Sequence, residues 1–216
     1  MEHDTTLKPI NKLSLMKQFL SLAAAALVAL SANAHVDGTT RYKVDANAST
    51  ISWHATKVTG EHSGTVGIQN GFLSSEDGAL VAANIIADMT QIRCTDLEGE
   101  WADKLVGHLN SEDFFAIEEF KTSSFSLKAF KPLSNNEEGM THEVSGEFTI
   151  RDQTHPVTFL AKVTEADGQL TIDGNVELDR SKYNVRYGSG SFFDDLGDNL
   201  IHDNFTVGFS LVATAM

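Results

Sequence analysis

Residues 141–179 read THEVSGEFTIRDQTHPVTFLAKVTEADGQLTIDGNVELD. Apolar and polar side chains alternate here in three consecutive runs, the first of which sets Val144 and Phe148 against Glu147 and Thr149. A period of two predicts β-strands with one dry face and one wet face. The links between the runs are short, so we expect neighbouring strands to pair antiparallel.

Shorter runs of the same kind predict strands elsewhere in the chain. These runs lie at 42–44, 51–55, 66–72, 80–87, 125–129 and 205–211. The run at 80–87 is too short for its period to separate strand from helix, and its β-branched residues favour strand. About eight main strands, with no long helix to cover the sheet, predict an all-β fold in which the sheet either closes into an eight-stranded antiparallel barrel or packs on a second sheet. Eight strands is the number at which a closed barrel can just hold one small ligand.

The connection at 88–121 departs from the strand pattern. Residues 95–98, TDLE, have the sequence of a capping box, and apolar residues recur at four-residue spacing from Leu97 through Trp101 to Leu109. This spacing predicts one accessory α-helix with these residues on a single apolar stripe. The connection at 180–200 is also long, and its aromatic residues favour an ordered lid or rim.

The N-terminal segment has the features of a secretory signal peptide. Met16 and Lys17 precede the apolar run 19–30, and Ala32-Asn33-Ala34 follows it. We expect residues 1–34 to be a signal peptide with an N-terminal extension, cleaved near Ala34, and residues 35–216 to be a periplasmic or secreted domain. The apolar run is too short to span a bilayer, so we expect no stable membrane span.

Composition argues against several classes of function. The chain has 216 residues and a formal net charge of −14, a balance that repels nucleic acid. Its single cysteine, Cys94, cannot close an intramolecular disulfide. The eight histidines show neither H-x-x-x-H nor H-E-x-x-H spacing, and no nucleophile motif occurs, so we expect no metal site and no enzyme.

Several stretches resemble a known family. They are YKVD at 42–45, STISW at 49–53, HLNSEDFF at 108–115 and VSGEFTI at 144–150. From Tyr42 to Ala213 the chain resembles the YceI-like family of exported, lipocalin-like, polyisoprenoid-binding proteins. The resemblance implies a lipocalin-like barrel, with a helix beside it and a long-chain isoprenoid or related amphiphile in the bore. We expect no cofactor other than this lipid, for which a quinone is one alternative. A homodimer is compatible with the sequence.

The predicted ligand-binding residues are those of inward parity on the strands together with three residues of the rim. They are Trp53, Ile68, Phe125, Val144, Phe148, Phe159, Ile172, Val176, Tyr183, Tyr187, His202, Phe205 and Phe209. Gly146 and Gly174 also have inward parity and favour an open bore, because they leave volume that side chains would fill.

Three functions follow from these patterns. The favoured one is a non-catalytic binding or transport protein for a long-chain isoprenoid or fatty amphiphile. The second is an enzyme acting on such a lipid, with Tyr183, Tyr187 and His202 at the mouth of the barrel. The third is a stress-related scaffold whose core is filled by the same inward side chains. Arg180 and His202 flank the long loop and are candidates to meet a phosphate or quinone headgroup.

Overall fold

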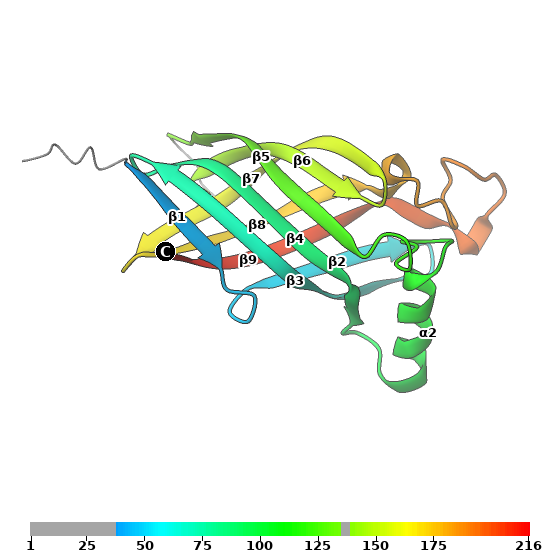
Figure 1. The fold of residues 1–216 in the computed structure, drawn as a ribbon. Coiled ribbons are helices and arrows are strands. Elements are labelled where there is room, and N and C mark those ends of the chain that lie inside the picture. Colours follow the sequence, from blue (N-terminus) through cyan, green and yellow to red (C-terminus); the bar gives the residue numbers. More distant parts are fainter. Residues whose placement is uncertain (1–37, 135–138) are drawn as a thin grey trace, which may run out of the picture. The chain divides into compact units, whose positions relative to one another are not determined.

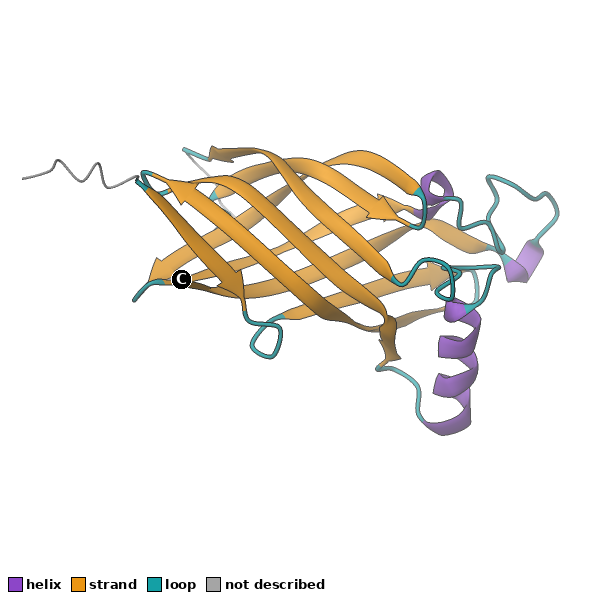
Figure 2. Cartoon of the chain, in the orientation of Figure 1, coloured by secondary structure: helices purple, strands orange, loops and turns teal. Residues whose placement is uncertain are grey.

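Strands make up most of the computed structural model, which describes residues 38–134 and 139–216 (Figures 1 and 2). The strands are β1 (Thr39–Val44), β2 (Thr50–Lys57), β3 (Gly60–Glu76), β4 (Ala79–Cys94), β5 (Thr122–Pro132), β6 (His142–Ile150), β7 (Gln153–Ala166), β8 (Gln169–Asp179) and β9 (Ile201–Ala215). Helix α2 (Gly99–Asn110) follows β4, and two short 3-10 turns, η1 (Arg180–Tyr183) and η2 (Gly197–Asn199), lie in the β8–β9 loop.

All strand pairs are antiparallel, and the sheet closes on itself. Its order is β1-β3-β2-β9-β8-β7-β6-β5-β4, with β4 also paired to β3 and β1 also paired to β9. Strands β1 and β2 lie one after the other in a single strand position between β3 and β9. Val44 of β1 pairs with Ala213 of β9, and Thr50 of β2 pairs with Ser210 of β9. Nine strands therefore occupy eight positions. The predicted eight-stranded antiparallel barrel with one accessory helix is confirmed.

The two ends of the barrel differ in how their strands are joined. At one end, which we call the turn end, two-residue Asp-Gly turns at 77–78 and 167–168 link β3 to β4 and β7 to β8. Both residues of each turn have positive φ, as a type I′ hairpin requires. The other end, which we call the helix end, carries α2 and the loop 184–200 (Figure 1). The long connections that sequence patterns assign to function are thus all at the helix end.

Helix α2 lies where the sequence predicts it, but the predicted capping box is wrong. Glu98 is the N-cap residue and makes no side-chain capping bond. Asp96 instead accepts a hydrogen bond from Ser63 N–H (2.8 Å) and contacts His62 Nδ1 (2.8 Å), which fixes the β4–α2 connection to β3. Trp101 is 70% exposed, so the apolar stripe is buried only in its C-terminal part, around Leu109.

Bulges shift the inward parity within β3 and β4. Their pairing slips between Thr65 and Gly67, between Ile68 and Asn70, and between Ser74 and Ser75. Two of these slips leave a single unpaired residue, Gln69 on β3 and Val81 on β4, whereas the slip after Thr65 leaves Val66 on β3 and residues 89–92 on β4 unpaired. A single extra residue moves the following side chains of its strand to the other face of the sheet. Simple alternation therefore does not identify every inward residue of these two strands.

Two buried clusters fill the ends of the barrel. The cluster at the turn end is built around Tyr42, Leu73, Leu80 and Leu170, and the cluster at the helix end includes Met89, Phe114 and Tyr183. No helix among the described residues is long and apolar enough to cross a membrane. The predicted signal peptide, residues 1–34, lies outside the described part of the chain.

Candidate ligand-binding cavity

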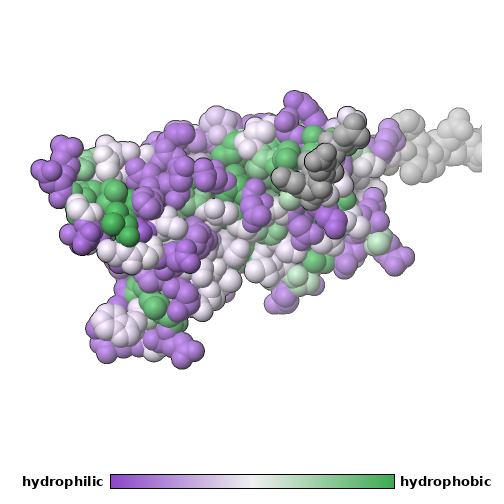
Figure 3. Space-filling model, turned by 180° about the vertical axis from the view of Figure 1, so that it is seen from behind, coloured by the Kyte–Doolittle hydropathy of each residue, from purple (hydrophilic) through white to green (hydrophobic). Residues whose placement is uncertain are grey.

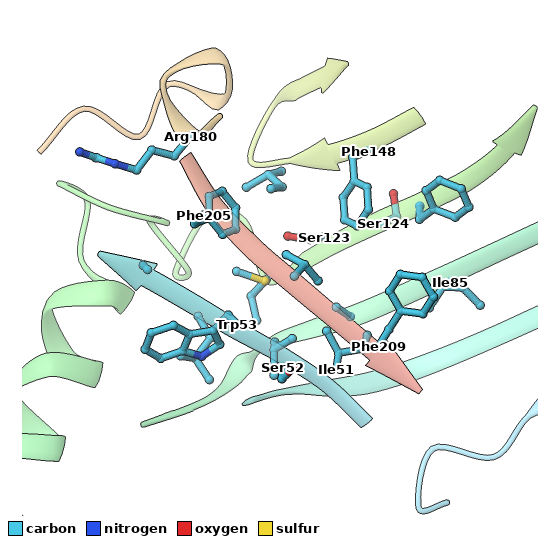
Figure 4. Close-up of a pocket in the computed structure, with 18 of the residues that line it drawn as sticks. Ile51, Ser52, Trp53, Ile85, Ser123, Ser124, Phe148, Arg180, Phe205 and Phe209 are labelled. Carbon is cyan, nitrogen blue, oxygen red and sulfur yellow. The ribbon is translucent and has the colours of Figure 1, made fainter. Parts of the chain in front are cut away.

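An apolar cavity of about 240 Å³ lies inside the barrel, and residues of both clusters contribute to its wall (Figure 4). Its lining on β4 extends from Leu80 to Ile92. At about 3.3 Å per residue this is about 40 Å along the strand, or about 30 Å along the barrel axis for a strand tilt of about 40°. The small volume and the long lining together describe a narrow bore, of a width suited to one extended chain.

The structure places nine of the thirteen predicted residues in the wall of this cavity. These nine are Trp53, Phe125, Val144, Phe148, Phe159, Ile172, His202, Phe205 and Phe209. The other four, Ile68, Val176, Tyr183 and Tyr187, are not part of the lining. Ile68 packs against the cluster at the turn end, and Val176 is buried in the cluster at the helix end.

Inward glycines let aromatic rings lie flat against the wall. Trp53 pairs directly with Gly64, and Phe209 pairs directly with Gly174. A methyl group on Gly174 would lie 2.7 Å from Cζ of Phe209, and one on Gly146 would lie 2.4 Å from Cε2 of Phe125. The expectation that Gly146 and Gly174 leave empty volume is therefore wrong. The rings of Phe125 and Phe209 occupy that space and line the cavity.

Arg180 organises the loop at the helix end rather than offering a free charge. Its side chain is 4% exposed, and it forms an ion pair of 3.3 Å with Asp203. Its guanidinium nitrogens donate to the backbone carbonyls of Val185, Tyr187, Ile201 and His202 at 2.8–3.2 Å. Burial lowers the pKa of Arg180, and Asp203 opposes that shift. With each nitrogen engaged, Arg180 is poorly placed to meet a phosphate headgroup.

The three residues proposed as an enzyme site differ in exposure and in the partners of their side chains. Tyr183 is 2% exposed, and burial raises its pKa to about 12, so its phenol stays neutral at ordinary pH. Tyr187 is 46% exposed and packs its ring against His108 (4.3 Å between centroids). His202 bonds Thr56 Oγ1 through Nδ1 at 2.7 Å. Of these three residues, His202 lines the cavity and the two tyrosines do not.

Sequence reasoning missed several residues of the cavity wall. Met89, Ile92, His108 and Phe114 line the helix end of the cavity. Met89 and Ile92 lie within residues 89–92 of β4, a stretch that does not pair with β3 and in which the alternation is broken. Phe114 belongs to HLNSEDFF, the segment that carries the family resemblance, and its ring meets His108 edge-on at 5.3 Å between centroids. That motif was the available signal for this part of the wall.

Histidine and acidic side chains do not assemble a metal centre within residues 38–134 and 139–216. His54 contacts Glu61 at 3.2 Å, and His62 contacts Asp96 at 2.8 Å. Hydrogen bonds lower the pKa of Asp96 to about 2, although burial opposes the shift. The cysteine, Cys94, donates to the same carboxylate at 3.3 Å, so these side chains form a structural tether.

The outer surface is largely hydrophilic, in contrast to the cavity. Figure 3 shows one face of the barrel, on which hydrophobic patches are small and separate. One patch lies over the long loop at the helix end, where Phe192 and Phe193 are exposed. The face seen in Figure 3 is thus mostly polar, whereas the cavity is apolar.

A family model supplies the remaining evidence on what kind of barrel this is. The model, described as a YceI-like domain, matches residues 42–213. The chain belongs to the YceI-like family. The match begins in β1 and ends near the last residue of β9. The YceI-like domain therefore includes every strand that lines the cavity.

Two solved structures share the fold of this YceI-like chain. BcnA from Burkholderia cenocepacia is 21% identical with a TM-score of 0.61, and the match covers 79% of this chain and 99% of BcnA. A polyisoprenoid binding domain from Saccharophagus degradans, implicated in plant cell wall breakdown, is 13% identical with a TM-score of 0.57, and the match covers 81% and 98% of the two chains. No curated protein sequence matches the chain.

Proposed function

We propose that this protein is a non-catalytic binding or carrier protein for a long-chain isoprenoid or a similar amphiphile, held inside the barrel. The observation that carries the proposal is the apolar bore, whose wall comes mainly from inward side chains of the strands. Apolar cavities of this kind stay dry and accept apolar guests. The fold shared with the polyisoprenoid binding domain supports the same class of ligand.

The energetics of such a ligand are favourable. Burying one methylene stabilises a complex by roughly 0.8 kcal/mol, so a five-carbon unit contributes roughly 4 kcal/mol before ordering costs. Micromolar binding requires about 8 kcal/mol net. A few units within a bore about 30 Å long supply that amount, so affinity needs neither a covalent bond nor a charged contact.

A non-catalytic role is also the simplest account of the side chains at the cavity. Arg180 is engaged by backbone carbonyls and Asp203, and Tyr183 is buried outside the cavity wall. General acid-base catalysis needs a titratable group within hydrogen-bond reach of the reacting atoms. Of the two tyrosines and His202, only His202 contributes to the cavity wall.

Lipid content and probe displacement test the proposal. Protein purified without detergent is extracted with organic solvent for mass spectrometry, and a fluorescent fatty probe is titrated into the delipidated protein. We expect a recovered isoprenoid or related amphiphile and competitive displacement of the probe. Absence of both lipid and probe binding would contradict the proposal.

A pair of neighbouring alanines on β4 provides the matched control. Ala83 lines the cavity, whereas Ala82 is exposed. Ala83→Trp fills the bore and should abolish probe binding, while Ala82→Trp places the same ring in solvent and should leave binding unchanged. Circular dichroism checks that both variants fold. Equal binding by both variants would place the probe outside the barrel.

We propose further that the carrier acts outside the cytoplasm after removal of residues 1–34. The n-region, apolar run and Ala32-Asn33-Ala34 site support this location. Expression of the full chain in a Gram-negative host, followed by fractionation and mass measurement, tests it. A periplasmic protein that begins near His35 is expected, and an uncleaved cytoplasmic protein would contradict the location.

A further inference from the structure

The cavity reaches the surface at the helix end of the barrel. Its lining there includes the exposed residue His202, together with Lys57 at the end of β2 and Leu105 on α2. At the turn end, by contrast, the lining residues Leu73 and Leu80 are buried. The helix end is therefore where a guest in the bore meets its surroundings.

Exposed apolar side chains gather at this same end. Within the described part of the chain eight large apolar side chains are exposed, and five of them belong to segments of the helix end. These five, between 40% and 70% exposed, are Val58 in the β2–β3 turn, Trp101 on α2, and Tyr187, Phe192 and Phe193 in the 184–200 loop. The turn and the loop are neighbours, because Val58 N–H donates to the carbonyl of Leu200 at 3.1 Å. Trp101 lies one helical turn before Leu105, on the same face of α2.

Basic side chains accompany these apolar groups. Lys104 Nζ lies 4.9 Å from the centroid of the Trp101 ring, and the guanidinium carbon of Arg186 lies 5.0 Å from the centroid of Phe192. Lys57 ends the strand that leads into the β2–β3 turn. Aromatic rings together with Lys or Arg are typical of segments that lie at the boundary between water and lipid, where the ring is buried and the cation meets headgroup phosphate.

The arrangement of the apolar side chains favours a bilayer over a protein partner. They stand on three separate segments, and the face in Figure 3 shows hydrophobic patches that are small and separate. A stable protein interface buries about 1,000 Å² or more in a continuous patch, whereas a bilayer accepts each anchor independently. A long isoprenoid chain also resides in a lipid phase before it is bound, because each methylene favours an apolar environment.

Acidic residues on the same segments specify the kind of surface that fits. They are Glu100 and Asp103 on α2, with Asp194, Asp195 and Asp198 in the loop, and all five are exposed. Two copies of the chain joined through this end would bring these carboxylates together, and an anionic bilayer would repel them. The headgroups of zwitterionic lipids, which carry one charge of each sign, can meet both the acidic and the basic side chains.

We propose that the helix end is a docking surface for a zwitterionic lipid bilayer, with Trp101, Phe192 and Phe193 inserted among the headgroups. This inference rests on the proposed function, because docking sets the open end of the cavity against the phase that holds the ligand. The contact is reversible and peripheral, since only single side chains enter the bilayer. It adds a membrane surface to the partners of the protein.

Vesicles of phosphatidylcholine with brominated acyl chains test the docking, because bromine quenches a tryptophan that enters the bilayer. The chain has two tryptophans, Trp53 in the cavity wall and Trp101 on α2. We expect quenching in the full-length wild type and none in Trp101→Phe, whose remaining indole lies inside the barrel. Residues 1–34 contain no tryptophan, so they add nothing to this signal.

A pair of exposed phenylalanines provides a matched control for binding measured by vesicle sedimentation. Phe193 is 50% exposed at the helix end, and Phe72 is 48% exposed on β3 toward the turn end. Phe193→Ser should lower the ratio of bound to free protein about fivefold, because the exposed half of the ring no longer enters the bilayer. Phe72→Ser should leave that ratio unchanged. Circular dichroism and binding of the fluorescent fatty probe check that both variants keep the barrel and its cavity.

The outcomes separate this inference from the proposed function. Equal sedimentation of the two serine variants, or quenching that persists in Trp101→Phe, would overturn the docking surface, while probe binding by the same proteins would leave the carrier role intact. Tighter binding to phosphatidylglycerol than to phosphatidylcholine vesicles would overturn the zwitterionic partner. A wild-type dimer that Phe193→Ser converts to a monomer would give this surface to a second copy and overturn the proposal. Failure of the wild type to bind the probe would reject the carrier role and this inference with it.

Discussion

Substitution of Gly146 by alanine tests how the bore is kept open. The added methyl group would lie 2.4 Å from Cε2 and Cζ of Phe125 and 2.5 Å from the carbonyl oxygen of Ser126, whereas ordinary contacts begin at 3.4 Å. The Phe125 ring must move by about 1 Å, and the only open direction is toward the bore. The carbonyl oxygen cannot rotate away, so the strands must also separate locally.

The expected cost follows from overpacking. Extra methyl groups in a packed interior destabilise by about 1–3 kcal/mol, and the backbone contact places this site at about 2–3 kcal/mol. For a domain of this size that corresponds to a melting temperature lower by about 5–10 °C. If the displaced ring excludes about two methylenes of ligand, affinity falls about tenfold.

Thermal unfolding followed by circular dichroism and titration of a fluorescent fatty probe measure the two effects. Gly107→Ala is the matched control, because Gly107 lies within α2 with open space around its Cα. Replacing a helical glycine by alanine stabilises by about 0.5–1 kcal/mol. If Gly146→Ala melted with wild type and bound the probe equally well, the packing of rings on glycines would not be what holds the bore open.

Three further predictions concern the supports of the cavity. Arg180→Lys should destabilise the protein by about 3–5 kcal/mol and expose the 184–200 loop to limited proteolysis. The control, Arg186→Lys, loses one bond to Asn184 and should leave the loop protected. Equal cleavage of the two variants would refute the role of Arg180. Asp96 has a pKa of about 2 in the folded protein against 3.8 ordinarily, so its contribution to stability is complete above pH 3.8 and disappears toward pH 2. Asp96→Asn should therefore lower the free energy of unfolding by about 1 kcal/mol at pH 7 and by little near pH 2, measured by chemical denaturation. A difference between the two proteins that did not depend on pH would count against this reasoning. Tyr42→Phe removes the bond to Glu165 (3.0 Å) and should cost about 1 kcal/mol by the same assay, with no change meaning that the bond is not formed in solution.

Most of the fold could be predicted from the alternation of apolar and polar residues along the strands. Alternation along Val144–Ile150 and its neighbours correctly predicts which faces are dry, since antiparallel barrels keep that period through each regular strand. Eight residues predicted from this alternation line the cavity for this reason, and the ninth, His202, was predicted as a rim residue. The helix was also found, from its apolar spacing. Both predictions use the pattern of neighbouring residues, and such a pattern predicts which way side chains face wherever no bulge interrupts the strand.

The features that the sequence did not predict depend on contacts between residues far apart in the chain. Thr95 and Glu98 do not form the expected capping box, and the Asp96 carboxylate between them instead bonds His62 and Ser63, over thirty residues earlier. Tyr183 turns into the core because Asn184 adopts a positive φ of 63° and Arg180 ties the following residues back. The register that sets rings over glycines depends on pairing between strands, which alternation along one strand does not contain.

The closure of the barrel has a consequence for how the chain acquires its structure. Strands β1 and β2 pair with β3 on one side, and their other side is paired by β9, the last strand of the chain. Met216 N–H donates to Arg41 O at 2.9 Å, so the first and last strands of the domain are neighbours. Ladders between such distant segments slow folding. The same proximity means that a short peptide joining residue 216 to residue 38, with new termini opened between Asp167 and Gly168, should give a permuted protein with the same barrel.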